Sequence, residues 1–586
     1  MDFSIIVHTF EKMEQTSSRL ALTDYLVALL KKTPHDILDK VIYLIQGKLY
    51  PDYYGIELGL AEKMAIRALA HSTGLSVASI EEIYRKTGDL GDTAGEIMKL
   101  RKQSTLFVEK MTVERVYLTL DKIARTAGSG SQEVKLQLTS GLLNDATPTE
   151  SRYIVKLMIG TLRLGIADYT VMDAMAIAFT DSKHNRKILE TAYNVSSDLG
   201  TVAKVLATNG LHSVELIQIT LNKPIRPMLA ERVRSSEEAL ERLHGKAAAE
   251  YKLDGERIQI HKKNENVNIF SRRLERITDH YPDVIDAINL IKVDSLIVEA
   301  EVVAINPSTE EFLPFQELMH RRRKYDIKQA IENYPVAMIF FDLLYINGDD
   351  KTCLTYFQRR KLLEKIIYGL KDDRIRLVQQ TIVTQPEQID KFMSSAIEIG
   401  CEGLMIKQLS SMYRAGAREF AWMKLKREYR SELADTLDLV IVGALYGRGR
   451  RVGKYGALLL AAYDSKADVF RSTCKVGTGF TDQHLEQFYK NLEKYLITHK
   501  HARIDTGIQM DVWFEPKIVI EVSGSELTLS PLHTAATNSI RNGYGLALRF
   551  PKFTGKIRYD KNPEDATDIE ELILMYKQQM KAIKKI

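Results

Sequence analysis

The chain carries the stretch Glu250-Tyr251-Lys252-Leu253-Asp254-Gly255-Glu256-Arg257 near its middle. Its Lys-x-Asp-Gly core has the form of a strand that runs into a turn. A neutral lysine amine attacks electrophiles such as the α-phosphorus of a nucleoside triphosphate, and the phosphoramidate that results is labile enough to pass the nucleotide on. On its own the fragment fits an ordinary surface turn at least as well, so the rest of the chain has to decide between the two interpretations.

A lysine amine must lose its proton before it can react. Nearby cations and partial desolvation lower a lysine pKa and so favour the neutral amine. The sequence offers candidate cations in Arg257, Arg272, Lys424 and Lys426, and Asp254 is a candidate to orient the amine.

The residues around this stretch predict a mixed α+β domain. The linker Lys223–Pro227 holds two prolines within four residues, which favours extended chain. Beyond it, alternating residues around Asn264-Glu265-Asn266 predict a hairpin. The sequence then predicts buried strands over 296–305 and 336–346 and helices over 356–368 and 386–399.

The region before this domain predicts helices from residue 1 to about 220. Leu22, Tyr25, Leu26, Leu29 and Leu30 recur at the three- and four-residue spacing of a helix face. The segment 147–150 reads Thr-Pro-Thr-Glu, in which the threonine and the glutamate form a capping box around a proline in the first turn. This helix is predicted to end near Gly165.

The region after residue 433 predicts a small β-barrel closed by a helix. Short apolar runs at 437–442, 457–463 and 518–522 are separated by glycine-rich turns. A terminal helix is expected over 567–583. We therefore expect a multidomain protein with domains at 1–222, 223–432 and 433–586, since a single core rarely exceeds about 300 residues.

Composition excludes several other classes of protein. Of 586 residues, 45% are hydrophobic and 27% charged, and 82 Lys and Arg against 77 Asp and Glu give a net charge of +5, which permits a nucleic-acid partner. Three scattered cysteines, Cys353, Cys401 and Cys474, cannot build a four-cysteine zinc site and fit a reducing compartment. The sequence indicates neither a signal peptide nor a membrane span, so we expect a cytoplasmic location.

Charged residues recur inside strand-like apolar segments further along the chain. Glu301 and Glu402 each lie among apolar residues, and Lys424 and Lys426 alternate with apolar residues, which places both lysines on one face of a strand. An inward charge needs a partner, and an anionic phosphate is one candidate for the lysines. A solvent-facing pair of lysines is the competing interpretation.

Taken in order, these segments resemble the nucleotidyltransferase motifs of ATP-dependent DNA ligases. The matching segments are Lys252–Arg257, Phe270–Arg273, Glu299–Val303, Phe340–Gly348, Glu402–Lys407 and Trp422–Lys426, with Leu548–Pro551 and Arg558–Lys561 near the end. Leu162–Gly165 resembles the helical DNA-binding domain of archaeal and eukaryotic replicative ligases, and the length resembles the archaeal members. One departure is Ala300, where the family commonly has glycine, which puts the local backbone conformation in question.

The resemblance implies a role for each residue of the motifs. Lys252 would be the adenylated nucleophile, Glu250 would read the adenine amino group and Phe341 would stack on the ring. The implied contacts to ribose and phosphates are Arg257, Arg272, Glu301, Arg418, Lys424 and Lys426, and the alternative for Arg257 and Arg272 is a later contact with the DNA 5′-phosphate. The implied metal ligands are Glu301 and Glu402, and the implied pyrophosphate-orienting residues are Arg558, Asp560 and Lys561.

The reaction implied by the resemblance is the sealing of nicks in duplex DNA, in replication, repair and recombination. Lys252 would take AMP from ATP with Mg²⁺, pass it to the 5′-phosphate, and release it when the 3′-hydroxyl attacks. The fold implied is an all-α N-terminal DNA-binding domain, an α+β adenylation domain and a C-terminal β-barrel of the OB type. Family members usually act as monomers.

Three further segments are candidates for contacts with partners. His320–Lys324 and Arg448–Arg451, the latter with Lys454, are basic and fit either phosphate contacts or a solvated surface, with the barrel location favouring DNA for the second. Gln103–Phe107 occupies the place of a sliding-clamp-binding segment in related archaeal ligases, although an ordinary loop fits it equally well.

Three alternatives remain at this point. RNA ligases and capping enzymes share Lys-x-Asp-Gly but generally lack a large N-terminal helical domain. An NAD-dependent ligase is disfavoured because its four-cysteine zinc site cannot be built here. A non-catalytic DNA-binding scaffold would have no need of Lys252.

Overall fold

The computed structural model describes residues 1–100, 109–305, 312, 315–322, 331, 334–399, 401–426, 436–447, 453–524, 526–549 and 551–584. One compact unit extends to Lys426 and a second comprises mainly the chain after it, and each is described by itself. The clamp-like segment Gln103–Phe107 and the basic segment Arg448–Arg451 lie outside the described residues.

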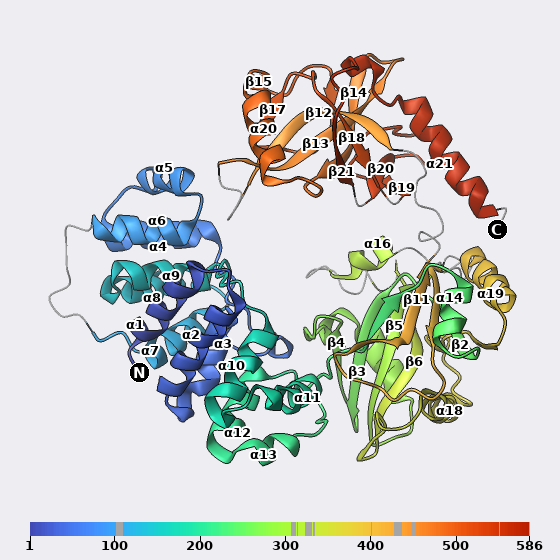
Figure 1. Cartoon of the computed structure of the whole chain (residues 1–586), viewed down its shortest axis with the longest axis horizontal. Coiled ribbons are helices and arrows are strands. Elements are labelled where there is room, and N and C mark those ends of the chain that lie inside the picture. The colour runs from blue at the N-terminus through green and yellow to red at the C-terminus, as the bar shows by residue number, and fades with distance from the viewer. Residues whose placement is uncertain are drawn as a thin grey trace. The chain divides into compact units, whose positions relative to one another are not determined.

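The first part of the first unit is an all-helical bundle (Figure 1). Its helices are α1 (Phe3–Glu14), α2 (Arg19–Lys32), α3 (Leu38–Ile45), α4 (Glu62–Thr73), α5 (Val77–Thr87), α6 (Leu90–Lys99), α7 (Val113–Arg125), α8 (Ser131–Asp145), α9 (Pro148–Met158), α10 (Asp168–Thr180), α11 (Arg186–Ser196), α12 (Leu199–Asn209) and α13 (Leu211–Glu215). One contiguous apolar core runs through the bundle, as the helical periodicity predicts.

Helix α9 begins as predicted but ends early. Thr147 and Glu150 form the predicted capping box, with Pro148 in the first turn. The predicted end near Gly165 is wrong, because α9 ends at Met158. Gly160 follows with φ +68°, and the Thr161 N–H donates to the Lys156 carbonyl at 2.9 Å. A glycine in the left-handed conformation, followed by an N–H that donates back to a carbonyl of the last turn, ends a helix even where the apolar spacing of the side chains continues.

Two sheets build the α+β part that follows. The five-stranded sheet has the order β1-β11-β10-β2-β9, and the six-stranded sheet runs β4-β3-β5-β6-β7 with β8 beside β6. The strands are β1 (Leu229–Arg232), β2 (Ala247–Lys252), β3 (Glu256–Lys263), β4 (Asn266–Ser271), β5 (Ser295–Ala304), β6 (Val336–Ile346), β7 (Asp349–Asp350), β8 (Ile375–Leu377), β9 (Gln380–Val383), β10 (Gly403–Lys407) and β11 (Arg418–Lys426).

Helices cover these sheets, and apolar residues of the two sheets pack against one another. They are α14 (Ser236–Arg242), α15 (Pro282–Asn289), α16 (Phe315–Leu318), α18 (Tyr356–Ile367) and α19 (Pro386–Glu398). One core joins the six-stranded sheet to α15 and α18, and another joins the five-stranded sheet to α14 and α19. The predicted hairpin turns at Asn264 with φ +55°, and the predicted strands and helices are confirmed to within two residues.

Ala300 adopts ordinary strand backbone in β5. It pairs with Ile258 on one side and Phe340 on the other, and its methyl group is buried in the core of the six-stranded sheet. The departure from glycine therefore leaves the strand that carries Glu301 regular on its β3 side.

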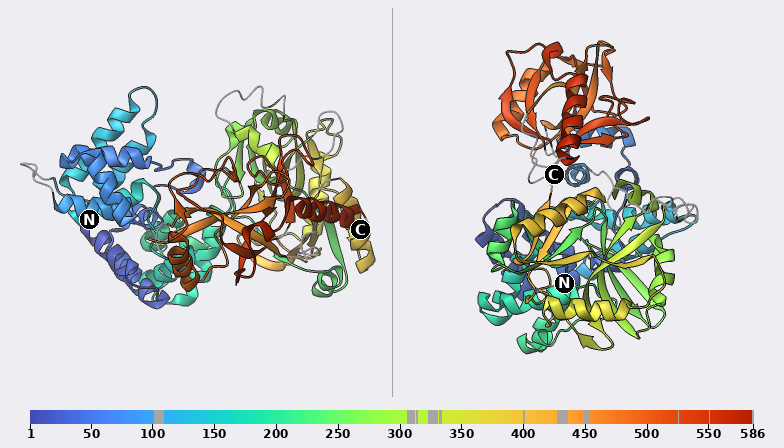
Figure 2. Two further views of the ribbon diagram at one scale, coloured as in Figure 1. Left: turned by 90° about the horizontal axis from the view of Figure 1, so that it is seen from above. Right: turned by 90° about the vertical axis from the view of Figure 1, so that its right-hand side faces the viewer.

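The second unit is β-rich, as expected. Its strands are β12 (Leu437–Tyr446), β13 (Tyr455–Asp464), β14 (Val469–Val476), β15 (Leu496–Ile497), β16 (Ile504–Asp505), β17 (Val512–Phe514), β18 (Val519–Ser523), β19 (Glu526–Ser530), β20 (Gly545–Arg549) and β21 (Lys552–Ile557). With α20 (Asp482–Glu493) and α21 (Ile569–Lys584), they enclose a common apolar core, and Figure 2 shows the strands curving around it. The cysteines are free thiols, and no described helix is long and apolar enough to cross a membrane.

Candidate active site

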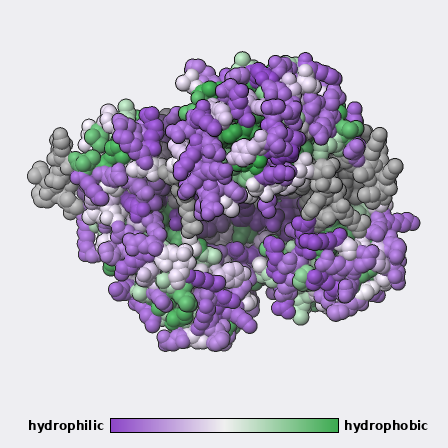
Figure 3. Space-filling model, turned by 45° about the horizontal axis from the view of Figure 1, so that its top comes forward, coloured by the Kyte–Doolittle hydropathy of each residue, from purple (hydrophilic) through white to green (hydrophobic). Residues whose placement is uncertain are grey.

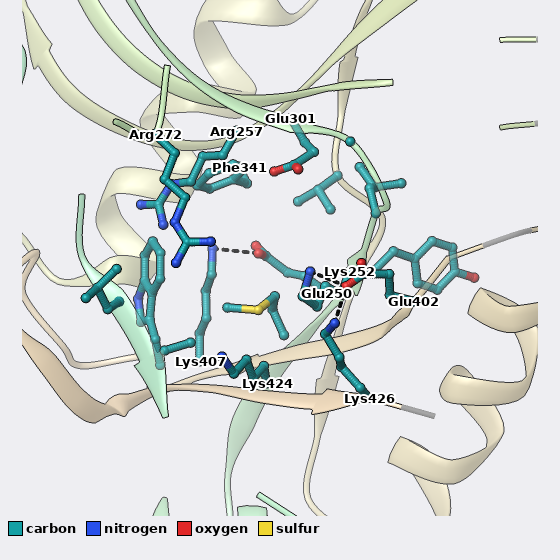
Figure 4. A pocket seen from close by; sticks show the side chains of 18 of the residues that line it. Glu250, Lys252, Arg257, Arg272, Glu301, Phe341, Glu402, Lys407, Lys424 and Lys426 are labelled. Atoms are coloured by element: carbon teal, nitrogen blue, oxygen red, sulfur yellow. Dashed lines mark ion pairs between the residues drawn. The ribbon is translucent and has the colours of Figure 1, made fainter. Parts of the chain in front are cut away.

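A cavity of about 330 Å³ in the first unit brings together every adenylation-domain residue that the motifs predicted, and Figure 4 labels all of them except Arg418. Residues of β2, β10 and β11 line one side, and β3, β5 and β6 supply the other. Its charged lining residues are Glu250, Lys252, Arg257, Arg272, Glu301, Glu402, Lys407, Arg418, Lys424 and Lys426. Seven cations against three carboxylates leave an excess of positive charge, which suits a polyanion such as a nucleoside triphosphate.

Strand register explains how Lys252 meets residues far along the chain. Gly403 pairs with Lys252 on one side and with Lys426 on the other, so the two lysines flank one glycine. Lys252 Nζ lies 2.6 Å and Lys426 Nζ 3.0 Å from the same Glu402 oxygen. Gly403 has φ +150°, and a Cβ there would lie 2.3 Å from the Leu425 carbonyl oxygen, so only glycine permits this convergence.

The glycine of the Lys-x-Asp-Gly motif has a similar steric cause. A Cβ on Gly255 would lie 2.2 Å from the Val302 carbonyl oxygen and 2.9 Å from the Glu301 side chain. The turn therefore packs directly against β5, which keeps Lys252 and Glu301 in one cavity. Asp254, expected to orient the amine, accepts the Phe315 N–H at 3.3 Å, while the lysine is paired with Glu402.

A β-bulge turns Phe341 toward the cavity. Glu299 pairs with Asp342 and Ala300 with Phe340, so Phe341 is the extra residue of β6. Its neighbours are buried elsewhere: Phe340 in the core and Asp342 in an ion pair with Arg359 at 2.7 Å. Bulges of this kind re-aim one side chain without disturbing the rest of a strand.

Charge and burial shift the pKa values of several lining residues. Burial raises the pKa of Glu301 to about 7, against the effect of Lys252 and Arg257. Burial also acts to raise the pKa of Glu402, but Lys252 and Lys426 outweigh it, so this carboxyl has a pKa well below its usual range. Burial and the neighbouring cations Arg418 and Lys426 lower the pKa of Lys424.

A buried ion pair lies at one end of the cavity. Lys407 Nζ is 2.6 Å from Glu250 Oε2, and the two side chains are 1% and 2% exposed. Tyr356 donates its hydroxyl to Glu250, and Gln380 Nε2 donates to the same carboxylate at 3.2 Å. Burial lowers the pKa of Lys407 although Glu250 opposes this. Sequence reasoning gave Lys407 no role, although its alternation with Met405 along β10 was a signal that both side chains share a face.

Other predicted residues lie in different surroundings. Arg257 Nη2 donates to both carboxylate oxygens of Glu299 at 2.9 Å, and the Arg257 side chain also lines the cavity. Arg321, in the first basic segment, is buried against Asp283 at 2.8 Å, so it is an internal ion pair rather than an exposed phosphate contact. Lys454 Nζ lies 3.0 Å from Glu486.

The three residues of the last motif form one charged cluster in the second unit. Arg558 binds both Asp560 and Asp438, and Lys561 Nζ lies 2.8 Å from Asp438. Asp438, in β12, had no role in the sequence prediction. Arg558 follows β21 and donates its N–H to the Val519 carbonyl at 2.8 Å, which fixes its backbone to β18.

Comparison with known proteins identifies the family. A family model described as "DNA ligase N terminus" matches residues 2–176, "ATP dependent DNA ligase domain" matches residues 227–426, and "ATP dependent DNA ligase C terminal region" matches residues 451–561. The DNA ligase of Nitrosopumilus maritimus (strain SCM1) is 54% identical over 582 residues, which cover 99% of each chain. That of Cenarchaeum symbiosum (strain A) is 52% identical over 584 residues, covering 100% of this chain and 99% of the relative.

A solved structure named Pmar-Lig_Pre. shares the fold. It aligns with a TM-score of 0.56 at 17% sequence identity and covers 94% of this chain and 99% of its own. With the family models and the full-length relatives, the chain belongs to the ATP-dependent DNA ligases, enzymes that use ATP to seal nicks in duplex DNA.

Proposed function

We propose that this ligase carries AMP on Lys252 Nζ. The observation that supports this most directly is the position of Lys252 in a cation-rich cavity, paired with Glu402 at 2.6 Å and flanked by Lys426. Mass spectrometry after incubation with ATP and Mg²⁺ tests it. One AMP-sized adduct is expected on Lys252, absent in Lys252→Arg and retained in a Lys365→Ala control on exposed α18. An adduct on another residue, or none, overturns the proposal.

The adenosine part of ATP lies between Glu250 and Phe341 in this proposal. Glu250 accepts the adenine amino group, and the aromatic face of Phe341 stacks on the base. Glu301 contacts the ribose. The phosphates are bound by the cations that line the same cavity, which are Arg257, Arg272, Arg418, Lys424 and Lys426.

The reaction proceeds in three phosphoryl transfers. The Lys252 amine, after it loses a proton to solvent, forms a bond to the α-phosphorus, and the bond to pyrophosphate breaks. An oxygen of the nick 5′-phosphate then displaces the amine and takes AMP. Finally the 3′-hydroxyl attacks the 5′-phosphorus, loses its proton and releases AMP. The chain's own part is to position these groups and to balance their charge.

Magnesium binding is assigned to Glu301 and Glu402. Both carboxylates line the same cavity, Glu402 acts to raise the pKa of Glu301, and Lys252 acts to lower the pKa of both, so the two are close enough to interact. Hard carboxylate oxygens suit Mg²⁺, and a cation there would offset the burial that disfavours an ionised Glu301. When bound, the ion would neutralise phosphate charge.

Arg558, Asp560 and Lys561 are proposed to orient the leaving pyrophosphate. Arg558 pairs with both Asp438 and Asp560, and Lys561 pairs with Asp438, which supports a common task. Arg558→Ala should slow adenylation of Lys252 and leave sealing of an already adenylated nick unchanged. Equal rates of adenylation in wild type and variant would contradict this role.

Three further assignments are proposals of the same kind. The domains are 1–222, 223–432 and 433–586. Gln103–Phe107 is proposed to bind the sliding clamp. A pull-down with the clamp compares wild type with Phe107→Ala, and equal retention of the two proteins would contradict this assignment. The protein is a monomer located in the cytoplasm. On the one face drawn in Figure 3, hydrophilic residues predominate and hydrophobic ones form separate patches, as on a surface in contact with water. Sedimentation equilibrium tests the oligomeric state.

A further inference from the structure

A second cavity, of about 280 Å³, lies within the first unit where the helical bundle meets the linker and the sheets. We call it the junction cavity. Its charged lining residues are Lys48, Asp52, Asp168, Arg226, Arg272 and Arg273. No role has been given above to Lys48, Arg226 or Arg273.

The junction cavity has an excess of positive charge. Lys48 Nζ is paired with Asp52 at 2.9 Å, and Arg226 Nη1 lies 3.7 Å from Asp168. Arg272 and Arg273 form no ion pair with any residue that the structure describes. Two arginines thus face a concave space without an acidic partner there, which is the condition for binding an anion.

The junction cavity adjoins the Lys252 cavity. Arg272 and Leu229 line both, so one arginine lies in their common wall. On its other side, Lys48 and Asp168 also line a third cavity, formed by Leu162–Ala167 and containing Arg163. Basic residues therefore follow a path from the nucleotide site to the helical bundle.

We propose that the junction cavity binds a phosphodiester group of the DNA strand that carries the nick 5′-phosphate, next to that phosphate. A triphosphate also offers phosphate groups, but its proposed place is the Lys252 cavity, whereas a path through three adjoining cavities suits a polymer with a phosphate at every nucleotide. Lys48 on the helical side and Arg273 on the sheet side then contact one strand, and DNA links the two parts of the unit. The inference rests on the proposed nucleotide position beside Lys252.

The test uses the full chain, pre-adenylated, with nicked duplex of fixed sequence. Affinity is measured over a range of salt concentrations for wild type, Arg273→Ala and Lys48→Ala/Arg273→Ala. Each lost phosphate contact should lower the slope of log K against log salt by about one, so the double variant should lose about two and bind more weakly at low salt. Lys365→Ala, which removes an exposed lysine of α18, should match wild type.

Adenylation with ATP in the absence of DNA serves as the second arm. It should stay within about twofold of wild type in both variants, which also establishes that they fold. Unchanged affinity and slope overturn the inference. Slow adenylation with unchanged DNA binding assigns the cavity to the phosphates of ATP and overturns it too. Absence of any AMP adduct in wild type instead refutes the proposed role of Lys252, so the two failures are distinguishable.

Discussion

Lys252 Nζ and Glu402 Oε2 are 2.6 Å apart, and the same oxygen lies 3.0 Å from Lys426. The carboxylate thus positions two amines that the strand register places on either side of Gly403. An ammonium held by a carboxylate is not a nucleophile, so the reaction proposed for Lys252 requires this pair to separate when phosphates arrive. Phosphate oxygens and a divalent cation are the groups that would compete for the two partners.

Glu402→Gln should slow AMP transfer to Lys252 by about 100-fold, the usual effect of losing one preorganised charged group in an active site. The amide keeps the shape but neither holds both ammonium groups nor offers a charged metal ligand. Single-turnover formation of the labelled enzyme measures the rate. Glu387→Gln, on the exposed first turn of α19, is the matched control. A rate of AMP transfer in Glu402→Gln within twofold of wild type would contradict the proposed role of Glu402 in this step.

Lys407→Met should cost about 3–5 kcal/mol of stability, because it leaves the Glu250 carboxylate buried without its partner. Glu250→Gln/Lys407→Met should recover most of that loss, since no buried charge remains. The midpoint of the first thermal transition reports this difference. Use of ATP should stay impaired in the double variant, with a raised KM, because the carboxylate proposed to accept the adenine amino group is gone. Full recovery of KM would contradict that role.

His261 should make stability fall as the pH drops below about 6.5. Burial lowers its pKa to about 3, and Nδ1 accepts the Asn222 N–H at 3.0 Å, so the folded protein keeps this ring neutral. The unfolded chain binds a proton near pH 6.5 and the folded chain only near 3, so acid favours unfolding in that window. Between pH 7 and 5.5 the loss should be about 1 kcal/mol.

Denaturant titrations at the two pH values measure that loss, and His261→Gln should abolish the part that the histidine contributes. His212→Gln is the control, because that ring is exposed. An equal pH response in wild type and His261→Gln would show that another group is responsible.

Gly416→Ala should destabilise the junction between the helical bundle and the sheets. Gly416 has φ +69°, and an added Cβ would lie 2.5 Å from Asn194 Oδ1. Asn194 and Gly416 are joined through Arg226, whose N–H donates to the Asn194 carbonyl at 2.8 Å and whose carbonyl accepts the Gly416 N–H at 3.0 Å. We expect a loss of about 2–3 kcal/mol, combining left-handed backbone strain with the steric clash.

Gly369→Ala separates these two contributions. Gly369 has φ +79° with nothing within 4 Å of an added Cβ, so alanine there introduces backbone strain alone. Thermal unfolding of both variants gives the difference. Equal destabilisation would mean that the contact with Asn194 adds nothing.

Some features of the site were predictable because their signals are local. The capping box of α9, the hairpin at Asn264 and the alternation of Lys424 and Lys426 each depend on neighbouring residues alone. The end of α9 was mispredicted because apolar spacing continued past a left-handed Gly160. Local periodicity reports which residues share a face, but it does not report where the backbone changes direction.

The sequence by itself determined most of the elements and the family, and it singled out Lys252 as the proposed nucleophile, because motifs and periodicities are properties of adjacent residues. Only the tertiary structure decided which distant residues meet: the register that joins Lys252, Gly403 and Lys426, the bulge at Phe341, and the burial of Lys407 against Glu250. The physical reason is that register, bulges and cavities result from packing between segments far apart along the chain. Such packing fixes distances and burial, and with them the charge that a side chain can carry.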